Sequence, residues 1–268
     1  MASFSVVSNI VSANAQANLQ GTSLGLQKAL TRLSSGYRIN YAGDDAAGLA
    51  VANSYRDKVA VLNQGVRNAN DGLSQLQIKD GALSNVATLL DRLATLATQA
   101  SSSSNGVDRT KLQSEFNDVR TEINREATVA GLDTSAAFSV FITSESTVSN
   151  GAVSATVGAA DTTTLSISSA VWTAATDAQA SLTAVQTAIS TLGGVQSTVG
   201  SLQNRLQFAI SLAQSQEVNT RAADSRIRDA NIAEESANMT RFNILSQSGI
   251  AALAQANQTS SSVLALLR

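Results

Sequence analysis

The sequence predicts a mainly α-helical protein, in which long antiparallel helices form nested coiled-coil or bundle layers with a small β-hairpin insert. Three observations lead to this prediction. The 268 residues include no proline, which suits long uninterrupted helices. Aromatic residues make up only 4% of the chain, so the buried surfaces should be thin seams rather than a globular core. An apolar seam then runs for five heptads over residues 62–97, a pattern that short strands cannot produce.

This seam belongs to the longest predicted helix. Its positions, in alternating steps of four and three, hold ten apolar residues and one carboxylate: Leu62, Val66, Ala69, Leu73, Leu76, Asp80, Leu83, Ala87, Leu90, Ala94 and Ala97. A helix from about residue 45 to residue 99 would run roughly 80 Å. Such a rod must lie beside other long helices, in its own chain or in neighbouring chains.

An amphipathic helix is predicted before it, from residue 3 to about residue 38. Its narrow apolar stripe contains Leu19, Leu26, Leu30 and Leu33. A Ser-Ser-Gly run at 34–36 ends the helix, and an irregular link follows. Asp44 or Asp45 then provides the N-cap of the long helix. Residues 1–43 therefore form a first segment.

A third helix should follow a Ser-rich turn at residues 100–106. Asp108 can cap it, and Gly131 ends it. Its apolar stripe contains Leu112, Phe116, Val119, Ile123 and Ala127. A short loop after a long helix implies an antiparallel neighbour, so the two helices of residues 44–133 should pack as a hairpin.

Residues 134–176 differ in character, because Ser, Thr, Val and Ala dominate and charges are few. β-Branched and alternating residues occur at 138–142, 152–157 and 164–168, separated by turn signals. We predict two or three short strands in a hairpin-like insert. The alternative is a disordered Ser/Thr loop.

Helix resumes at Asp177. A second seam occupies Leu182, Val185, Ile189, Leu192, Gln196, Val199, Gln203, Leu206, Ile210 and Ala213, with Gly193-Gly194 as a weak point. This helical segment comprises residues 177–223.

The last segment comprises residues 224–268 and is also predicted to be helical. Its apolar stripe contains Phe242, Leu245, Gly249, Ala252, Ala256, Ser260, Val263 and Leu267.

The composition excludes several kinds of site. Without His or Cys there is no ordinary zinc site, thiolate nucleophile or Ser-His-Asp triad, so we expect neither an enzyme nor a cofactor. A net charge of −2 without a basic cluster argues against nucleic acid. The sequence contains no run of 18 apolar residues, so we expect no membrane span. The N-terminus lacks the cationic region of a secretory signal.

Three local features remain open to more than one interpretation. The Asp44-Asp45 pair could bind a hard cation, but a helix cap is the commoner role. Trp172 is more readily a packing anchor than a ligand platform. A charge-rich stretch could be a solvated face or an intersubunit salt-bridge belt; it contains Arg221, Asp224, Arg226, Arg228, Asp229, Glu234 and Glu235.

Several motifs resemble those of bacterial flagellin. They are LSSGYRIN at 33–40, DDAAG at 44–48, RNANDG at 67–72, SRIRDA at 225–230, ANM at 237–239, AQANQ at 254–258 and VLALLR at 263–268. The resemblance covers roughly residues 1–130 and 180–268. The middle of the chain matches the place of the family's variable region.

This resemblance implies a structural subunit that self-assembles into the flagellar filament for motility. The terminal helices would form an inner tube, D0, and the long helices a surrounding layer, D1, without large outer domains. The expected inner-tube contacts are Leu26, Leu30, Leu33, Val263, Leu264 and Leu267. The implied partners are other copies of the chain, an export chaperone, and cap and hook-junction proteins. Export would be through the flagellar type III channel to the cell exterior without a cleaved signal.

The resemblance also suggests an immune-receptor epitope. Residues 91–99 are similar to the segment recognised by Toll-like receptor 5, with Arg92 and Leu96 at matching places and Glu115 on the next helix. Ala94 and Thr95 depart from the family's charged residues there. In the alternative interpretation Leu96 packs laterally and Arg92 pairs with a neighbouring subunit.

Two other functions remain as alternatives. One is a hook–filament junction protein, which shares the terminal helices. The other is a cell-surface homologue that binds polysaccharide, with Phe138, Phe141 and Trp172 as possible platforms.

Overall fold

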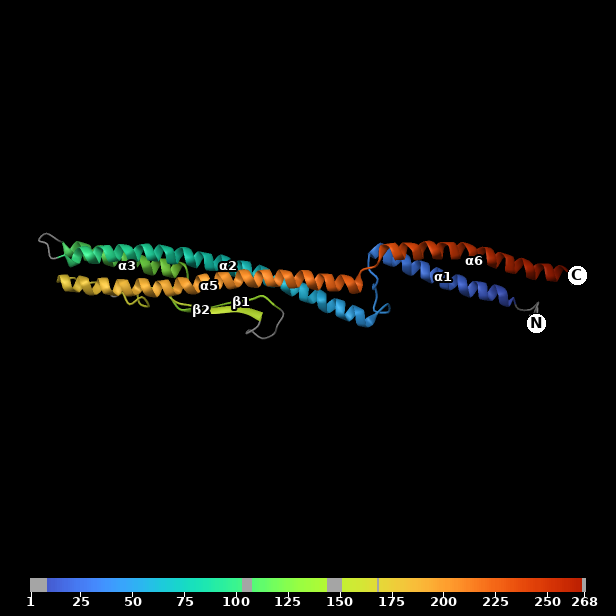
Figure 1. Cartoon of the computed structure of the whole chain (residues 1–268), viewed down its shortest axis with the longest axis horizontal. Helices are drawn as coiled ribbons and strands as arrows, with labels where there is room; N and C mark the ends of the chain where they lie inside the picture. Colours follow the sequence, from blue (N-terminus) through green and yellow to red (C-terminus); the bar gives the residue numbers. More distant parts are fainter. Residues whose placement is uncertain (1–8, 103–107, 144–150, 168, 267–268) are drawn as a thin grey trace. The chain divides into compact units, whose positions relative to one another are not determined.

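A computed structural model describes residues 9–102, 108–143, 151–167 and 169–266 (Figure 1). The chain forms two compact units. One contains residues 1–57 and 220–268, and the other contains residues 58–219. The described part is mainly helical with one small antiparallel sheet, as the sequence predicts.

Three helices build the unit of residues 58–219. Most of α2 (Ala46–Ser101) and α5 (Ala175–Arg228) belongs to it, together with the shorter α3 (Arg109–Val129). The three lie side by side, with α3 and α5 antiparallel to α2 (Figure 1). At 56 residues α2 is about 84 Å long, and its bounds agree with the predicted helix to within two residues. The Gly193-Gly194 pair does not interrupt α5.

The predicted seam of α2 is half correct. One row is buried as expected: Leu62, Ala69, Leu76, Leu83, Leu90 and Ala97. The other predicted row lies at the edge of the core: Val66, Leu73, Ala87 and Ala94 are half-buried and pack against it, whereas Asp80 is exposed. Its place is taken by the residues three positions after the first row, which are buried apart from a half-buried lysine: Gly65, Gly72, Lys79, Val86, Leu93 and Ala100.

The same displacement occurs in α5. The row of Val185, Leu192, Val199, Leu206 and Ala213 is buried as predicted, whereas Ile189 is 38% exposed. The second buried row contains Ala188, Val195 and Leu202. On a helix, the residues three and four positions after a buried residue lie to either side of it. Which of the two is buried therefore depends on where the neighbouring helices and strands pack. Hydrophobicity alone does not reveal that choice.

Helix ends follow the predicted chemistry. Asp108 accepts a hydrogen bond from the Lys111 N–H at 3.2 Å and caps α3. Gly131, with φ +62°, follows the end of α3. Lys79 lies in the second seam row of α2 and donates from Nζ to the carbonyl oxygens of Ala130 and Gly131 at 3.1 and 2.6 Å. Its ammonium thereby covers carbonyls that the end of a helix leaves unpaired, although desolvation by burial lowers the pKa of Lys79.

The insert contains two strands, β1 (Ala136–Phe141) and β2 (Ala152–Val157), paired antiparallel with Phe138 opposite Ala155. No third strand forms over residues 164–167, and residue 168 of the predicted strand lies outside the described residues. Residues 164–167 instead belong to a turn, in which the Asp161 carboxylate accepts the N–H groups of Thr163 and Thr164, both at 3.2 Å. Ser166 has φ +57°, which is incompatible with an extended strand.

Residues 159–167 and 169–174, here called the strap, pack along α3. Its backbone bonds to three amide side chains on that helix. Asn124 accepts from the Thr162 N–H at 2.9 Å, and Asn117 accepts from the Ala170 N–H at 3.1 Å. Gln113 accepts from the Trp172 N–H at 2.9 Å. These bonds satisfy backbone donors that have no ladder partner.

Trp172 anchors the end of the strap, as predicted. Its ring is buried and meets Phe116 edge-on, with centroids 5.0 Å apart. The indole Nε1 donates to the Ser181 hydroxyl at 3.0 Å. A buried ring cannot serve as an exposed sugar platform.

In the other unit, α1 (Ile10–Ser35) and α6 (Ile232–Leu266) form an antiparallel pair. Asn9 caps α1 by accepting from the Ser12 N–H at 3.0 Å. Gly36, in the left-handed conformation with φ +74°, ends α1 at the predicted break.

Candidate assembly site

The terminal helices α1 and α6 contact one another along much of α1. Near the chain link Arg32 donates to Glu235 at 2.9 Å, and further along the pair Gly25 faces the ring of Phe242. Leu19 then packs at Gly249. At the far end the Asn9 side chain donates to the Ala256 carbonyl at 3.1 Å. The contacts therefore follow one antiparallel register from end to end.

The predicted inner-tube residues do not all lie on the contact between α1 and α6. Leu26 and Leu33 are half-buried on α1, whereas Leu30 is 46% exposed. Val263 and Leu264 belong to α6, but their side chains lie outside the described part, as does Leu267.

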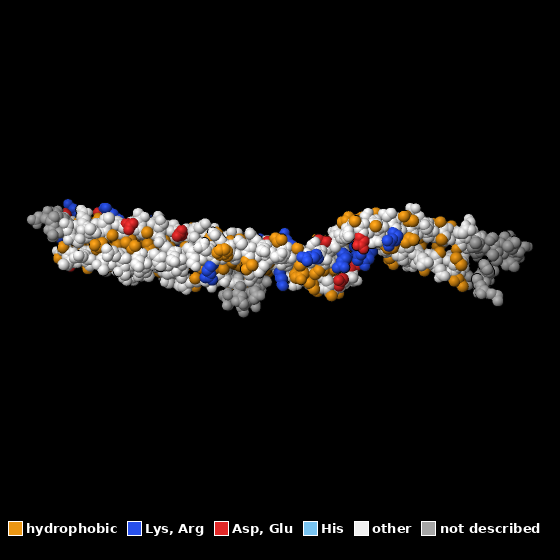
Figure 2. Space-filling view, viewed as in Figure 1, with side chains coloured by type: hydrophobic (Ala, Val, Ile, Leu, Met, Phe, Trp, Pro, Cys, Tyr) orange, Lys and Arg blue, Asp and Glu red, His pale blue; other side chains and the backbone are white. Residues whose placement is uncertain are grey.

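Further apolar side chains are exposed on both helices. They are Ile10, Val11 and Leu24 on α1, and Ile232, Ile244, Leu245 and Ile250 on α6. Figure 2 shows hydrophobic side chains on the visible face of this pair. Most of them fall outside the stripes proposed from the sequence, because those stripes follow the face that contacts the partner helix. Exposed apolar side chains in such numbers indicate a surface that other molecules cover.

Two chain segments next to the helix pair, one after α1 and one before α6, are hydrogen-bonded to each other. Tyr37 and Asp229 form an isolated antiparallel bridge. On either side of it, the Arg38 N–H donates to the Arg228 carbonyl at 2.7 Å and the Ala230 N–H donates to the Gly36 carbonyl at 2.8 Å. We call residues 36–38 and 228–230 the clasp.

Charged side chains reinforce the clasp. The Arg228 guanidinium lies 4.2 Å from the centroid of the Tyr37 ring, and Arg38 donates to the Ile227 carbonyl at 2.8 Å. The charge-rich stretch is thus neither only a solvated face nor only an intersubunit belt. Arg228 and Asp229, together with Glu235 beyond the clasp, have partners within the chain.

The Asp44-Asp45 pair has structural roles. Asp45 accepts from the Gly48 N–H at 2.8 Å and caps α2. Asp44 pairs with Lys28 at 2.8 Å and accepts from the Asn40 N–H at 3.2 Å. The hydrogen bond from Lys28, followed by that from Asn40, lowers the pKa of Asp44. Among the described residues, no cluster of three or more acidic side chains could hold a metal ion.

The epitope-like residues divide into two kinds. Arg92 and Glu115 form an ion pair across α2 and α3 with both side chains substantially exposed, and Arg92 Nε lies 3.0 Å from Glu115 Oε1. Leu96 is 1% exposed and belongs to the core of this unit, so it does not share the exposed surface of Arg92 and Glu115. It lies one position before Ala97, on the side of the seam that the sequence pattern did not identify.

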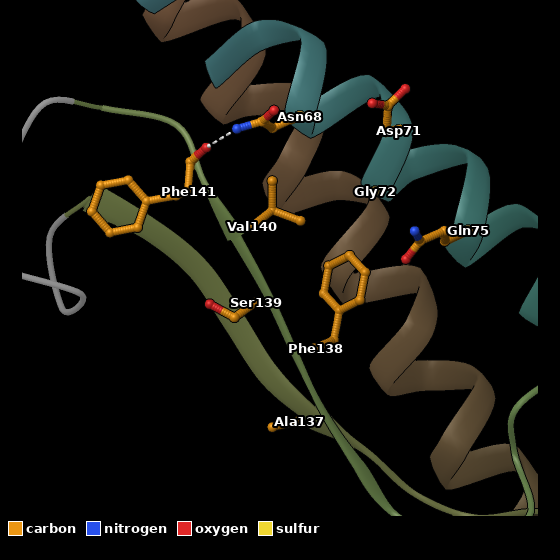
Figure 3. Close-up of a pocket in the computed structure, with 9 residues that line it drawn as sticks. All are labelled: Asn68, Asp71, Gly72, Gln75, Ala137, Phe138, Ser139, Val140 and Phe141. Carbon is orange, nitrogen blue, oxygen red and sulfur yellow. Dashed lines mark hydrogen bonds between the residues drawn. The ribbon is translucent and has the colours of Figure 1, made fainter. Parts of the chain in front are cut away.

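A cleft of about 390 Å³ lies between α2 and β1 (Figure 3). Asn68, Asp71 and Gln75 line its helical side. Asn68 donates to the Phe141 carbonyl at 3.3 Å, and Figure 3 shows Phe138 directed toward α2.

Two glycines allow β1 and the residue that follows it to approach α2 closely. A methyl group on Gly65 would overlap the carbonyl oxygen of Ile142 and lie 2.6 Å from its carbonyl carbon. A methyl group on Gly72 would lie 2.6 Å from Val140. The sequence gives no apolar signal at either position, which explains why the second seam row was missed.

These features define a mainly helical protein of the structural class, with paired terminal helices that leave apolar side chains exposed. None of the helices in the described ranges is both long and apolar enough to cross a bilayer.

Comparison with known proteins identifies the family. The model of the bacterial flagellin N-terminal helical region matches residues 6–139, and that of the C-terminal helical region matches residues 182–267. The flagellin of Halalkalibacterium halodurans is 37% identical over 97% of this chain and 98% of its own length. The flagellin of Bacillus subtilis is 32% identical over 97% and 98%, respectively. The chain belongs to the bacterial flagellin family.

Two further similarities are of the same kind. Flagellin FlaB1 of Treponema pallidum is 32% identical over 95% of this chain and 96% of its own length. The crystal structure of Bacillus cereus flagellin covers 59% of this chain with a TM-score of 0.46 and 28% identity. The family consists of structural proteins, so this chain is a subunit that assembles into the flagellar filament. The hook-junction and polysaccharide-binding alternatives are not favoured.

Proposed function

We propose that α1 and α6 form the inner D0 layer of the filament and that the remaining helices form D1. D0 would comprise residues 1–43 and 224–268. D1 would comprise residues 44–133 and 177–223, with the insert at 134–176. The observation that carries this proposal is the set of apolar side chains that the α1–α6 pair leaves exposed.

The proposed inner-tube contacts are Leu26, Leu30, Leu33, Val263, Leu264 and Leu267. Of these, Leu30 is the clearest, because it lies on α1 and its side chain is 46% exposed. Covering a Leu side chain contributes about 1.5–3 kcal/mol, and a filament repeats each contact in every subunit. Head-to-tail contacts that do not close give an open helical polymer.

Partners beyond the filament itself follow from the family. We propose an export chaperone, cap and hook-junction proteins, and passage to the cell exterior through the flagellar type III channel without a cleaved signal. No catalytic role is proposed.

Recognition of the free subunit by Toll-like receptor 5 is proposed for Arg92 and Glu115, whose side chains are exposed. Leu96 would support this surface from inside by holding α2 against its neighbours, since it is buried. In an assembled filament neighbouring subunits would cover the same surface.

Truncation tests the assembly proposal. Purified chain with residues 264–268 deleted, mixed with short filament seeds and a precipitating salt, should give no filaments by negative-stain electron microscopy. Far-ultraviolet circular dichroism and Trp172 fluorescence should remain those of the full chain, because the long helices lie elsewhere. Filaments at normal yield from the truncated chain would contradict the proposed role of the C-terminal stripe.

A point variant provides a finer test. Leu30→Ala should reduce filament yield while leaving Trp172 fluorescence unchanged. Ile78→Ala is a control, because Ile78 is an exposed apolar residue on α2 rather than on the terminal pair. Equal loss of filaments from both variants would contradict a specific role for Leu30, because any exposed apolar side chain, on the terminal pair or on α2, would then affect assembly.

A further inference from the structure

The terminal pair has few charges that could fix how α1 and α6 align. Residues 1–27 and 242–267 contain no Asp, Glu, Lys or Arg. In the described part, the ion pair between the two helices is Arg32–Glu235, near the chain link. Elsewhere Ala, Ser, Asn, Gln and Leu recur along both helices, and repetitive faces specify register weakly. A steric feature would be the simplest way to prevent slippage.

Phe242 provides such a feature. Its ring lies over Gly25 of α1, where an added methyl carbon would be only 2.6 Å from Cζ and 2.7 Å from Cε1. Gly21, one turn earlier on the same helix, has open space around it. The ring therefore fills the space that the missing side chain leaves at Gly25, as a knob fills a hole, whereas no described residue packs against Gly21.

A second, shallower contact has the opposite arrangement. Here the gap is on α6 at Gly249, and the filling side chain is Leu19 of α1, whose Cδ1 would be 3.1 Å from an added methyl carbon. Two contacts with the large residue on opposite helices must both move if the pair slips. This geometry allows one alignment and disfavours its neighbours.

We infer that the Phe242 ring at Gly25 fixes the axial register of α1 on α6, and that this register is required for the pair to add to a filament. The inference rests on the proposed inner-layer role of the pair. A slip by one helical turn would carry the exposed apolar residues of α1 about 5.4 Å past those of α6. The composite surface offered to the next subunit would then no longer match.

Matched alanine substitutions test this inference in the full chain. Gly25→Ala should slow seeded elongation about tenfold or more, because the ring must leave the gap. Gly21→Ala should elongate within about twofold of the parent, since the same substitution there meets no neighbour. The double variant Gly25→Ala/Phe242→Leu should recover most of the loss, because a smaller side chain packed against the added methyl group restores an interlocking contact at the same position.

The outcomes distinguish failure of the register inference from failure of the proposed assembly role. If the parent chain forms no filaments with seeds, the proposed assembly role is wrong. If the parent and Gly25→Ala elongate equally, or if Gly21→Ala is equally impaired, the register inference is wrong. Failure of the double variant to recover would also overturn it. Unchanged Trp172 fluorescence in every variant would show that residues 58–219 remain folded.

Discussion

The two units of this chain bury their helices to very different extents. In α5, nine residues are buried, all of them within the unit of residues 58–219. In α1, Ala29 is the buried residue, and most of the apolar stripe is half-buried at best. Tertiary packing of an amphipathic face supplies most helical stability in proteins, so we expect α1 and α6 to gain stability from further partners, whereas the helices of residues 58–219 pack on one another.

This difference explains how one chain can be both a folded subunit and an assembly unit. Residues 58–219 have a continuous core that includes Leu93, Phe116 and Trp172. The terminal pair has little buried core and leaves apolar side chains exposed, and we expect neighbouring subunits to cover them. Variants should therefore divide by unit: those in one should change stability of the free subunit, and those in the other should change assembly.

The largest effect should come from Leu96→Ala. Removal of a side chain that is 1% exposed should lower the free energy of unfolding by about 3 kcal/mol, since a cavity remains in the core. Leu30→Ala on α1 should change it by less than about 0.5 kcal/mol. Urea unfolding followed by Trp172 fluorescence reports the stability of residues 58–219, because the indole is buried in that unit. Leu96→Ala should therefore shift this transition, and Leu30→Ala, in the other unit, should leave it in place. Equal stability losses would remove the distinction between the units.

Gly65→Ala should have the next largest effect. A methyl group overlaps the Ile142 carbonyl, so we expect a loss of about 2 kcal/mol in the same unfolding assay. Gly81→Ala, on the same helix but in open space, should instead stabilise by about 0.5–1 kcal/mol through helix propensity. Two losses of similar size would mean that the hairpin does not depend on close approach at Gly65.

A smaller loss is expected when the strap is loosened. Asn124→Ala removes the acceptor for both the backbone N–H and the hydroxyl of Thr162, each at 2.9 Å. The cost should be about 1–2 kcal/mol, because the donors of Thr162, a buried residue, lose their partner. Thr121→Ala is the control, since its hydroxyl bonds only within α3. Thermal unfolding should distinguish the two variants, and equal melting temperatures would contradict the role of the amide side chains.

The smallest effect concerns pH. Because the folded-state pKa of Asp44 is lowered, its contribution is present above the unfolded value near 3.8 and is lost as pH falls through the folded value. Lys28→Met should reduce that acid sensitivity. Lys28 is about half exposed, so the difference should be at most about 1 kcal/mol. Amide exchange near Asn40 between pH 5 and 3 would measure it, and identical profiles in parent and variant would exclude Lys28 as the cause.

Much of this fold could be predicted from sequence because long helices have long patterns. The bounds of α2, the Asp108 cap and the break at Gly36 all follow from periodicity and capping chemistry. The second seam row could not be predicted, since Gly65, Gly72 and Lys79 were selected for size and for capping rather than for hydrophobicity. The third strand failed for a related reason: Asp161 organises a turn that β-propensity does not register.

The candidate site was predicted only in part. Family resemblance identified the terminal helices, but not that Leu30 is 46% exposed while Leu26 and Leu33 are half-buried. The clasp was also missed, because a single bridge between residues 37 and 229 has no local pattern. Such a contact between residues distant in sequence depends on where α1 and α5 end in space, which the sequence pattern does not indicate.

Hydrogen exchange provides the most direct test of the difference between the two units. Exchange of backbone amides should be measured in the free subunit and in sedimented filaments of the same chain. We predict that α3 and residues 58–101 and 175–219 are protected in both states, whereas residues 10–35 and 232–258 exchange quickly in the subunit and become protected in the filament. Equal protection of α1 and α6 in the free subunit would contradict the claim that neighbouring subunits complete their packing.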